Sequence, residues 1–291
     1  MEKTDRVFQF NKALTYEELA RKVDQLINEY PFIQKNTIGH SVLGKEIFEL
    51  RIGTETEIIH YNASFHANEW ITTLIAMRFL EEYASEYNKK APQTNYALSI
   101  IPMVNPDGVD LVLGGYELGG PFKDEVIKIN EGITSFSNWK ANIRGVDLNK
   151  QFPAGWEIEA ERKPKSPHFR DYPGYAPLTE PESIAMVQFA KENNIARLHA
   201  LHTQGEEIYW GFQDFEPKES EEIVQQYAEK SGYKAVRDID NYAGFKDWYL
   251  QEFRKPAFTL ELGHGVNPLP LSQLDEIYKK SSEIFKLSME C

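Results

Sequence analysis

The sequence predicts an α/β fold in which a mixed or parallel β-sheet is covered by helices on both faces. Apolar and β-branched runs of strand length alternate along the chain with longer segments that repeat apolar residues at helical spacing. Some of these runs, such as residues 97–103, are apolar enough to be buried strands. No internal repeat, low-complexity tract or flexible linker divides the 291 residues, so we expect a single domain over residues 1–291.

Capping and turn signals delimit the elements in the first half of the chain. Thr15 and Glu18 have capping-box spacing, which predicts the start of a helix that ends before Pro31. A Leu-Gly-Lys turn at residues 43–45 lies between two apolar runs and predicts a β-hairpin. The further predicted elements are hairpin strands at 40–42 and 47–52, a strand at 58–63, a helix at about 69–87 and a strand at 97–103.

The second half resumes the alternation after a long irregular segment. Residues 105–108, Asn-Pro-Asp-Gly, predict a turn. Residues 114–175 look mostly irregular, and a loop segment of that length is more often functional than idle. The remaining predicted elements are a helix capped by Thr179 and Glu182, a strand at 197–202, helices at about 219–231 and 247–253, a strand at 257–262, and a last helix that Ser272 and Asp275 open and that reaches about residue 287.

Composition disfavours several kinds of partner. The net charge is −13, and an acidic surface repels both nucleic acid and anionic membrane, so we expect neither as a partner. Residues 1–14 are polar, and no stretch approaches the roughly 18 apolar residues that a membrane span needs. The only cysteine, Cys291, cannot form an internal disulfide. We expect a cytoplasmic protein, although a chain trimmed of an export signal would look the same.

Three residues have the types and positions expected of a zinc site. His66 and Glu69 lie where the strand at 58–63 passes into a helix, a turn that lets both side chains reach one cation. Zinc sites that perform chemistry commonly use three His, Glu or Asp ligands. His199 and His202 lie on one strand and must point to opposite faces. His202 is at the carboxyl end of its strand and is the predicted third ligand, whereas His199 is predicted to be a hydrogen-bonded structural residue.

Glu261 interrupts the otherwise apolar strand at 257–262. An ionised carboxylate in such a strand is costly unless a metal, a cation or a hydrogen-bond network meets it. Beside a zinc ion, it could act as the general base and then protonate a leaving amine. The alternative is a solvent-facing residue at a sheet edge.

Two residues of the Trp-Lys-Ala-Asn-Ile-Arg-Gly-Val-Asp-Leu-Asn run at 139–149 suit supporting roles. Arg144 carries a guanidinium that could stabilise negative charge on a carbonyl oxygen during hydrolysis, although an isolated arginine is more often solvated or part of a structural ion pair. Asp147 could hold the far nitrogen of a zinc-bound histidine.

The order of these motifs along the chain resembles the zinc metallocarboxypeptidase family, the funnelins, over about residues 35–290. The resemblance implies a three-layer α/β/α sandwich around a twisted, mixed and mostly eight-stranded sheet. It also implies one Zn²⁺ ion per chain, held by His66, Glu69 and His202, with Arg144 polarising the scissile carbonyl and Glu261 as the general base. Tyr242, a few residues before Asp247 and Trp248, resembles the mobile tyrosine that closes over substrate in the family.

One departure from ordinary carboxypeptidases concerns the substrate. Asn149 is followed by Lys150, where ordinary carboxypeptidases carry an arginine that clamps a terminal carboxylate, and a lysine cannot make the planar two-bond fork. The runs at 150–156, 202–205 and 263–270 resemble bacterial γ-D-glutamyl-L-diamino acid endopeptidases. This likeness implies a peptidoglycan stem peptide as substrate, cut between γ-linked D-glutamate and the diamino acid.

The same resemblance implies substrate contacts from Asn149, Lys150 and Lys246. In relatives, the residue at the position of Lys246 lines the pocket for the side chain after the scissile bond, where a cation would suit the side-chain carboxylate of meso-diaminopimelate; the alternative is a solvated lysine. We therefore expect a peptidase of cell-wall recycling. The rivals are an ordinary carboxypeptidase, a zinc amidohydrolase of small amino-acid conjugates, and a non-catalytic wall-peptide binder.

Overall fold

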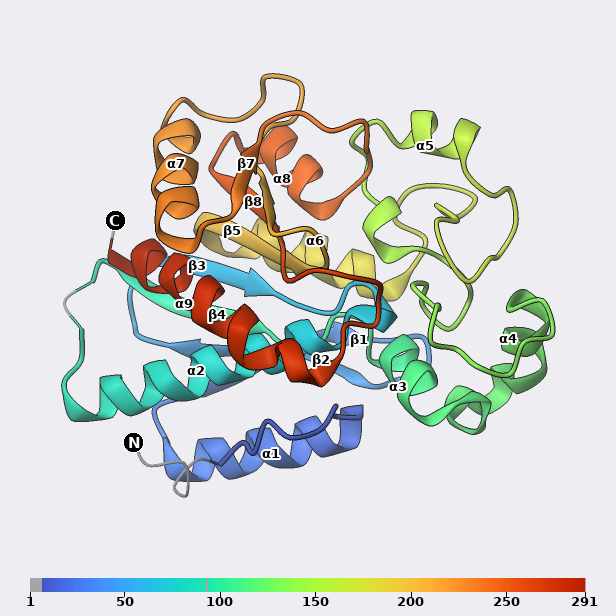
Figure 1. Cartoon of the computed structure of the whole chain (residues 1–291), viewed down its shortest axis with the longest axis horizontal. Coiled ribbons are helices and arrows are strands. Elements are labelled where there is room, and N and C mark those ends of the chain that lie inside the picture. Colours follow the sequence, from blue (N-terminus) through green and yellow to red (C-terminus); the bar gives the residue numbers. More distant parts are fainter. Residues whose placement is uncertain (1–6, 93, 291) are drawn as a thin grey trace.

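The computed structural model describes residues 7–92 and 94–290, and within them one eight-stranded mixed sheet forms the centre of the molecule (Figure 1). The strand order is β1-β2-β4-β3-β5-β8-β6-β7. The strands are β1 Gln34–His40, β2 Glu46–Ile52, β3 Glu57–Asn62, β4 Tyr96–Ile101, β5 Asn194–His202, β6 Glu207–Tyr209, β7 Lys234–Val236 and β8 Ala257–Glu261. Cys291 lies outside the described residues.

The middle of the sheet is parallel and its two sides contain antiparallel pairs. Strands β4, β3, β5 and β8 run parallel to one another, whereas the pairs β1 with β2, β2 with β4, and β6 with β8 are antiparallel. His202, the last residue of β5, is paired with Glu261, the last residue of β8. The carboxyl ends of β3, β5 and β8 therefore meet at one edge, where open α/β sheets bind ligands.

Helices cover both faces of the sheet, as the sequence predicted. One hydrophobic cluster joins α1, α2, α7 and α9 to one face, and a second joins α6 and α8 to the other. The helices are α1 Tyr16–Glu29, α2 Ile71–Lys89, α3 Pro106–Gly114, α4 Lys123–Ile129, α5 Trp156–Arg162, α6 Pro181–Glu192, α7 Glu219–Ser231, α8 Phe245–Phe253 and α9 Leu274–Glu290. No helix of the described residues is long and apolar enough to cross a membrane.

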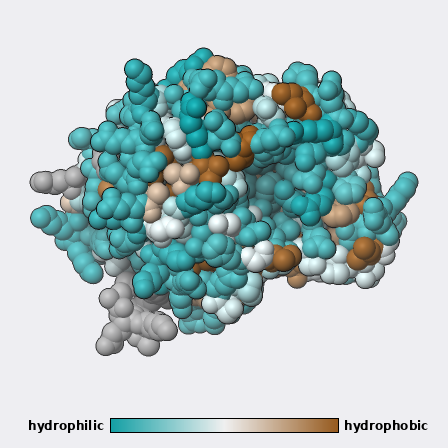
Figure 2. All heavy atoms as spheres, turned by 45° about the horizontal axis from the view of Figure 1, so that its top comes forward, coloured by the Kyte–Doolittle hydropathy of each residue, from teal (hydrophilic) through white to brown (hydrophobic). Residues whose placement is uncertain are grey.

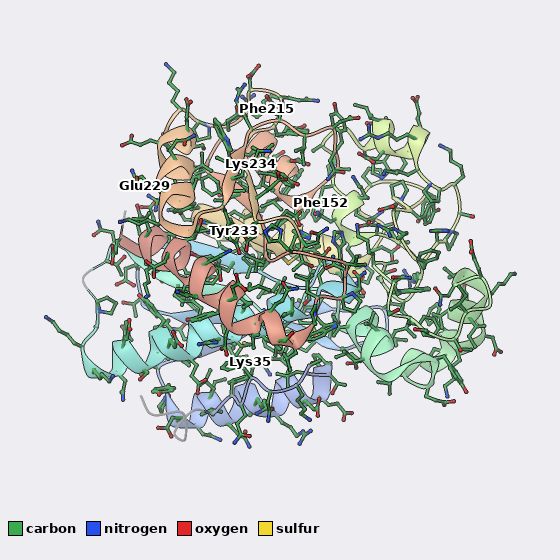
Figure 3. All side chains as sticks on the ribbon, viewed as in Figure 1. Lys35, Phe152, Phe215, Glu229, Tyr233 and Lys234 are labelled. Atoms are coloured by element: carbon green, nitrogen blue, oxygen red, sulfur yellow. The ribbon has the colours of Figure 1, made fainter. Side chains whose placement is uncertain are left out.

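A group of aromatic rings in the second cluster packs against the residues at the carboxyl edge of the sheet. Phe152, labelled in Figure 3, contacts Phe65, Phe245 and Trp248 with ring centroids 5.1–6.1 Å apart. The ring of Phe65 also stacks on His202 at 6.2 Å. These contacts fix the segment just before His66 on a packed, apolar base.

Some element bounds differ from the prediction for identifiable reasons. The first hairpin strand is 34–40 rather than 40–42, because Ser41 and Lys45 close the turn and the Val42 amide donates to Glu182. Residues 105–108 begin α3 instead of forming a turn: Pro106 occupies the first turn and the Asn105 side chain accepts from the Gly108 amide at 3.0 Å. Strands β6 and β7 were not predicted, since three residues each carry little signal.

The long segment at 114–175 is irregular for much of its length but contains α4, α5 and short 3₁₀ turns. Its apolar side chains, among them Val126, Phe136 and Trp139, form a third cluster with Leu111 of α3. The helix predicted to be capped by Thr179 starts at Pro181, because Thr179 donates its amide and hydroxyl to Gln151 instead.

Glu182 provides a stability test of this architecture. It is buried in the first turn of α6, and burial together with the charges of Asp107 and Glu180 raises its pKa from 4.5 to about 8. The folded state therefore holds the proton more tightly, and the stabilisation from this group is fully present below pH 4.5 and lost as the pH rises through about 8.

Glutamine cannot ionise, so the Glu182→Gln variant does not lose this stabilisation as the pH rises. We compare the free energy of unfolding of the variant with that of wild type at about pH 5.5 and at about pH 8.5. From the lower to the higher pH, the difference should shift in favour of the variant by about 1–3 kcal/mol. Urea unfolding at both pH values measures this difference. Glu192→Gln, an exposed substitution on the same helix, is the control and should show no such change. If the stability difference between Glu182→Gln and wild type is the same at both pH values, the raised pKa of Glu182 is contradicted.

Candidate active site

The carboxylate of Glu69 lies between two imidazoles. Its Oε1 is 2.8 Å from Nδ1 of His66, and its Oε2 is 2.9 Å from Nδ1 of His202. The two Nδ1 atoms are 3.2 Å apart, and one ligand atom from each residue lies within 4.8 Å of the others. All three side chains are buried. The structure thus brings together the three residues that the sequence predicted as metal ligands.

Local hydrogen bonds explain why the chain turns as it does between His66 and Glu69. β3 ends at Asn62, and Ser64, with φ 51°, donates its amide to the Thr72 hydroxyl at the start of α2. Residues 67–69 form a 3₁₀ turn that the Glu69 amide closes onto the carbonyl of His66. This compact turn places both side chains above the end of β5.

The donor set fits a zinc ion. Two ligands at about 2.0–2.1 Å from one ion at the tetrahedral angle lie about 3.3 Å apart, close to the 3.2 Å between the imidazole nitrogens. Burial raises the pKa of Glu69, but the neighbouring charges of His66 and His202 outweigh it and hold the pKa below its ordinary value. An ionised carboxylate at such depth needs a cation, and a metal ion at this point supplies one.

Asp147 and Lys140 lie behind the ligands. Asp147 Oδ1 is 3.2 Å from Nε2 of His66, and Oδ2 is 3.7 Å from Nζ of Lys140. Burial raises the pKa of Asp147, but Lys140 and His66 hold it below its ordinary range. Burial lowers the pKa of Lys140, but Asp147 and Asp171 raise it overall. Both groups are therefore charged, and Asp147 has the geometry predicted for the partner of a metal-bound histidine.

Glu261 lines a cavity of about 370 Å³ beside Glu69, which we call the site cavity. Strand β8 lies between β5 and β6, so Glu261 is not at a sheet edge. Burial, and then the charge of Glu69, raise the pKa of Glu261 to about 8. The residues lining the site cavity are Asn68, Glu69, Asn138, Lys140, Arg170, Thr203, Gln204, Tyr209, Glu261, Gly265, Val266 and Asn267.

Polar side chains dominate this lining. Figure 2 shows a face of the molecule that is hollowed near its middle, with mostly hydrophilic residues in and around the hollow. Asn267 illustrates how the polar wall supports the site: its Nδ2 is 3.4 Å from Glu69 Oε1 and 3.0 Å from the carbonyl of Thr203. Such a cavity suits a polar ligand with several hydrogen-bonding groups.

Arg144 and Tyr242 do not line the site cavity. The Arg144 side chain is 46% exposed, and its Nη1 is 3.5 Å from Oε2 of Glu180. Tyr242 packs its ring against Phe212 at 6.1 Å, beneath the guanidinium of Arg162 at 5.3 Å. The cations that do line the cavity with Glu69 and Glu261 are Lys140 and Arg170.

Lys150 and Lys246 are buried and do not line the site cavity. Lys150 is 3.1 Å from Glu159 Oε1 and also contacts Asn241. Lys246 is 2.6 Å from Asp247 Oδ1 and donates to a backbone carbonyl at 2.7 Å. Both ammonium groups already meet a protein carboxylate, so binding of a substrate carboxylate by either stays a prediction that requires these contacts to open.

Asn149 and His199 have the positions that their strands and turns suggest. Nδ2 of Asn149 is 3.4 Å from Nε2 of His202, and its Oδ1 accepts from the Phe245 amide, so Asn149 lies against the metal ligands but outside the site cavity. His199 is buried, with Nε2 3.1 Å from the Tyr227 hydroxyl, and burial lowers its pKa to about 3. It is the structural residue that strand alternation predicted.

Lys140, Arg170 and Asn267 were not selected as site residues from the sequence. Lys140 reaches the site because its carbonyl accepts from the Ala67 amide at 3.1 Å, a contact between distant segments that no local pattern reveals. Arg170 lies in the long irregular segment, where the sequence suggested that Arg170 and Asp171 could shape one side of the cleft but gave Arg170 no role. Asn267 belongs to the 263–270 run, which carried a motif signal without identifying the residue.

Residues 19–283 match the sequence family described as zinc carboxypeptidase. The chain is 50% identical over 277 residues to the uncharacterized protein YqgT of Bacillus subtilis (strain 168), covering 91% of this chain and 74% of the relative. It is 47% identical over 279 residues to gamma-D-glutamyl-L-diamino acid endopeptidase 1 of Lysinibacillus sphaericus, covering 93% of this chain and 70% of that relative. Carboxypeptidase A from Helicoverpa armigera shares the fold, with a TM-score of 0.78 at 19% identity over 99% of this chain and 76% of that one.

We expect Asp147→Asn to weaken zinc binding about 10–100-fold, because the neutral amide no longer increases the basicity of His66. Competition with a chromogenic chelator measures the zinc dissociation constant. Asp171→Asn is the matched control, since Asp171 Oδ1 also meets Lys140, at 3.5 Å, but makes no hydrogen bond to a predicted ligand. Equal losses in the two variants would mean that Asp147 acts only through Lys140.

Proposed function

The chain belongs to the zinc carboxypeptidase family, and from that premise we propose that it hydrolyses the amide bond between γ-linked D-glutamate and a diamino acid in peptidoglycan stem peptides. It is a zinc-dependent metallopeptidase with a His-Glu-His ligand set for one ion, so the resemblance seen in its sequence motifs is confirmed. Meso-diaminopimelate is the diamino acid that we propose.

The observation that carries this proposal is the 47% identity to a γ-D-glutamyl-L-diamino acid endopeptidase over nearly the whole chain. The site cavity supports it, because its wall combines a carboxylate next to the predicted ligands with two cations, Lys140 and Arg170. A stem peptide with free carboxylates is an anionic ligand. On a chain of net charge −13, such a ligand needs local positive charge to bind.

The chain's own residues account for the proton transfers of hydrolysis. When bound, zinc supplies Lewis-acid chemistry, which polarises a carbonyl and lowers the pKa of water. Glu261 accepts a proton from the attacking water as the hydroxyl adds to the carbonyl carbon. The proton then passes to the amide nitrogen as the carbon–nitrogen bond breaks. The products are a free γ-carboxyl group on the glutamyl residue and the amine of the diamino acid.

Lys140 is our proposed partner for the negative charge on the carbonyl oxygen, the role that the sequence suggested for Arg144. The Lys140 side chain is only 17% exposed and lines the site cavity with Glu69 and Glu261. Its ammonium group is held in place by Asp147 and Asp171. A fixed, poorly solvated cation at this point is the kind of group that stabilises a developing oxyanion.

Recycling of wall peptides inside the cytoplasm is the setting that the sequence suggested, and it stays a prediction. Fractionation of cells that produce the full-length protein, followed by detection with a specific antibody, tests the compartment.

Zinc-loaded protein incubated with L-Ala-γ-D-Glu-meso-diaminopimelate should release free diaminopimelate and L-Ala-D-Glu, detected by mass spectrometry. We expect the isomer with an α-linked D-glutamate to remain intact. Glu261→Gln should bind zinc yet lower kcat by about 10²–10⁴-fold, because it cannot accept the proton. An intact γ-linked tripeptide, with ordinary peptides losing a carboxyl-terminal residue in the same assay, would mean a general carboxypeptidase.

We expect Lys140→Met to lower kcat on the tripeptide about 10²–10³-fold, because the oxyanion loses its cationic partner. KM and zinc content should change little. Arg144→Gln should stay within about threefold of wild type, since the only ion pair of the Arg144 side chain in the described residues is with Glu180, and that side chain is outside the site cavity. If Arg144→Gln lowers kcat strongly and Lys140→Met does not, Arg144 and not Lys140 stabilises the oxyanion.

A further inference from the structure

A second cation, Arg170, lies in the wall of the site cavity next to Lys140. Its side chain is 48% exposed, and its Nε donates to Oδ2 of Asp171 at 3.2 Å. Within the described residues, neither of its terminal nitrogens makes a hydrogen bond. The guanidinium therefore keeps donors available to a ligand, in the planar arrangement that matches a carboxylate.

The backbone holds Arg170 beside Lys140. The carbonyl of Phe169 accepts from the amides of Lys140 and Ala141 at 2.8 and 3.2 Å. The Arg170 amide donates to Nδ1 of His168 at 3.3 Å, and the ring of Phe169 packs against the third hydrophobic cluster. Two segments far apart in the chain are thus tied together at the cavity, and two cations share Asp171 between them.

The lining of the site cavity favours the acyl side of the bond to be cut. The family resemblance places Lys150 and Lys246 on the side of the leaving portion of the substrate, and neither lines this cavity. Lys140, the more buried cation, interacts with Glu69 and Glu261 and is assigned to the carbonyl oxygen. Arg170, the more exposed one, is then available to the next group along the acyl chain.

The chemistry of a γ-glutamyl bond supplies that next group. When D-glutamate is linked through its side-chain carboxyl, its α-carboxylate stays free, separated from the scissile carbonyl carbon by only two methylene groups and the α-carbon. A neutral residue in an ordinary α-peptide offers no charge at that distance. An α-linked glutamate does carry a carboxylate there, but its nitrogen is attached next to the scissile carbonyl and not next to the free carboxylate. A cation on the acyl side can therefore distinguish a γ-glutamyl group from neutral acyl residues by one charge-assisted pair.

We propose that Arg170 binds the free α-carboxylate of the γ-linked D-glutamyl residue and is a specificity-determining residue for acyl groups that carry this carboxylate. This inference rests on the proposed function, and it adds a carboxylate subsite on the acyl side of the site cavity. Arg170 acts on substrate binding and orientation and takes no part in proton transfer.

The test compares two tripeptides that differ only in this group: L-Ala-γ-D-Glu-meso-diaminopimelate and its D-isoglutaminyl analogue, in which the α-carboxylate is a carboxamide. Wild type should lose about 10–100-fold in kcat/KM on the amidated peptide, the size expected for one charge-assisted pair. Arg170→Gln should cleave both peptides equally, at about the wild-type rate on the amidated one. Arg170→Lys should keep part of the preference.

Arg237→Gln is the matched control, because Arg237 is 44% exposed and lies outside the site cavity, so its preference should equal that of wild type. Thermal unfolding of each variant checks the fold. If wild type cleaves both peptides without preference, or if Arg170→Gln keeps the preference, the inference is overturned while the proposed function stands. If wild type cleaves neither peptide, the proposed function fails and the inference falls with it.

Discussion

The buried carboxylate of Glu69, placed between the imidazoles of His66 and His202, is the interaction on which the rest of the site depends. Removing such a charge from water is costly, and the structure offsets the cost with two imidazoles and a hydrogen bond from Asn267. The two imidazoles and the carboxylate are also ligands that zinc prefers, and a bound zinc ion would further offset the cost of burying the Glu69 charge. Every other site residue is arranged around this centre.

The sheet explains how residues far apart in sequence meet there. β3, β5 and β8 are adjacent and parallel, so the segments following them emerge at one edge. His66 and Glu69 follow the end of β3, His202 is the last residue of β5, and Glu261 is the last residue of β8. The irregular segment at 114–175 brings Lys140 and Arg170 to the wall of the site cavity. Scaffold and specificity thus come from different parts of the chain.

This division explains what the sequence alone could predict. His66, Glu69 and His202 stand at strand ends whose positions follow from periodicity, so their convergence could be predicted. Lys140 could not, because its place depends on a hydrogen bond between its carbonyl and the distant Ala67 amide. Arg144 carried a plausible chemistry but turns to Glu180 instead. Short strands such as β6 escaped prediction because three residues show no reliable alternation.

The most direct test of the whole account is a crystal structure of Glu261→Gln with zinc and L-Ala-γ-D-Glu-meso-diaminopimelate. The account predicts one ion on the three ligands, the γ-carbonyl oxygen beside Lys140, and the α-carboxylate of D-glutamate paired with Arg170. An ion bound elsewhere, or a substrate whose α-carboxylate lies on the side of Lys150 and Lys246, would contradict it.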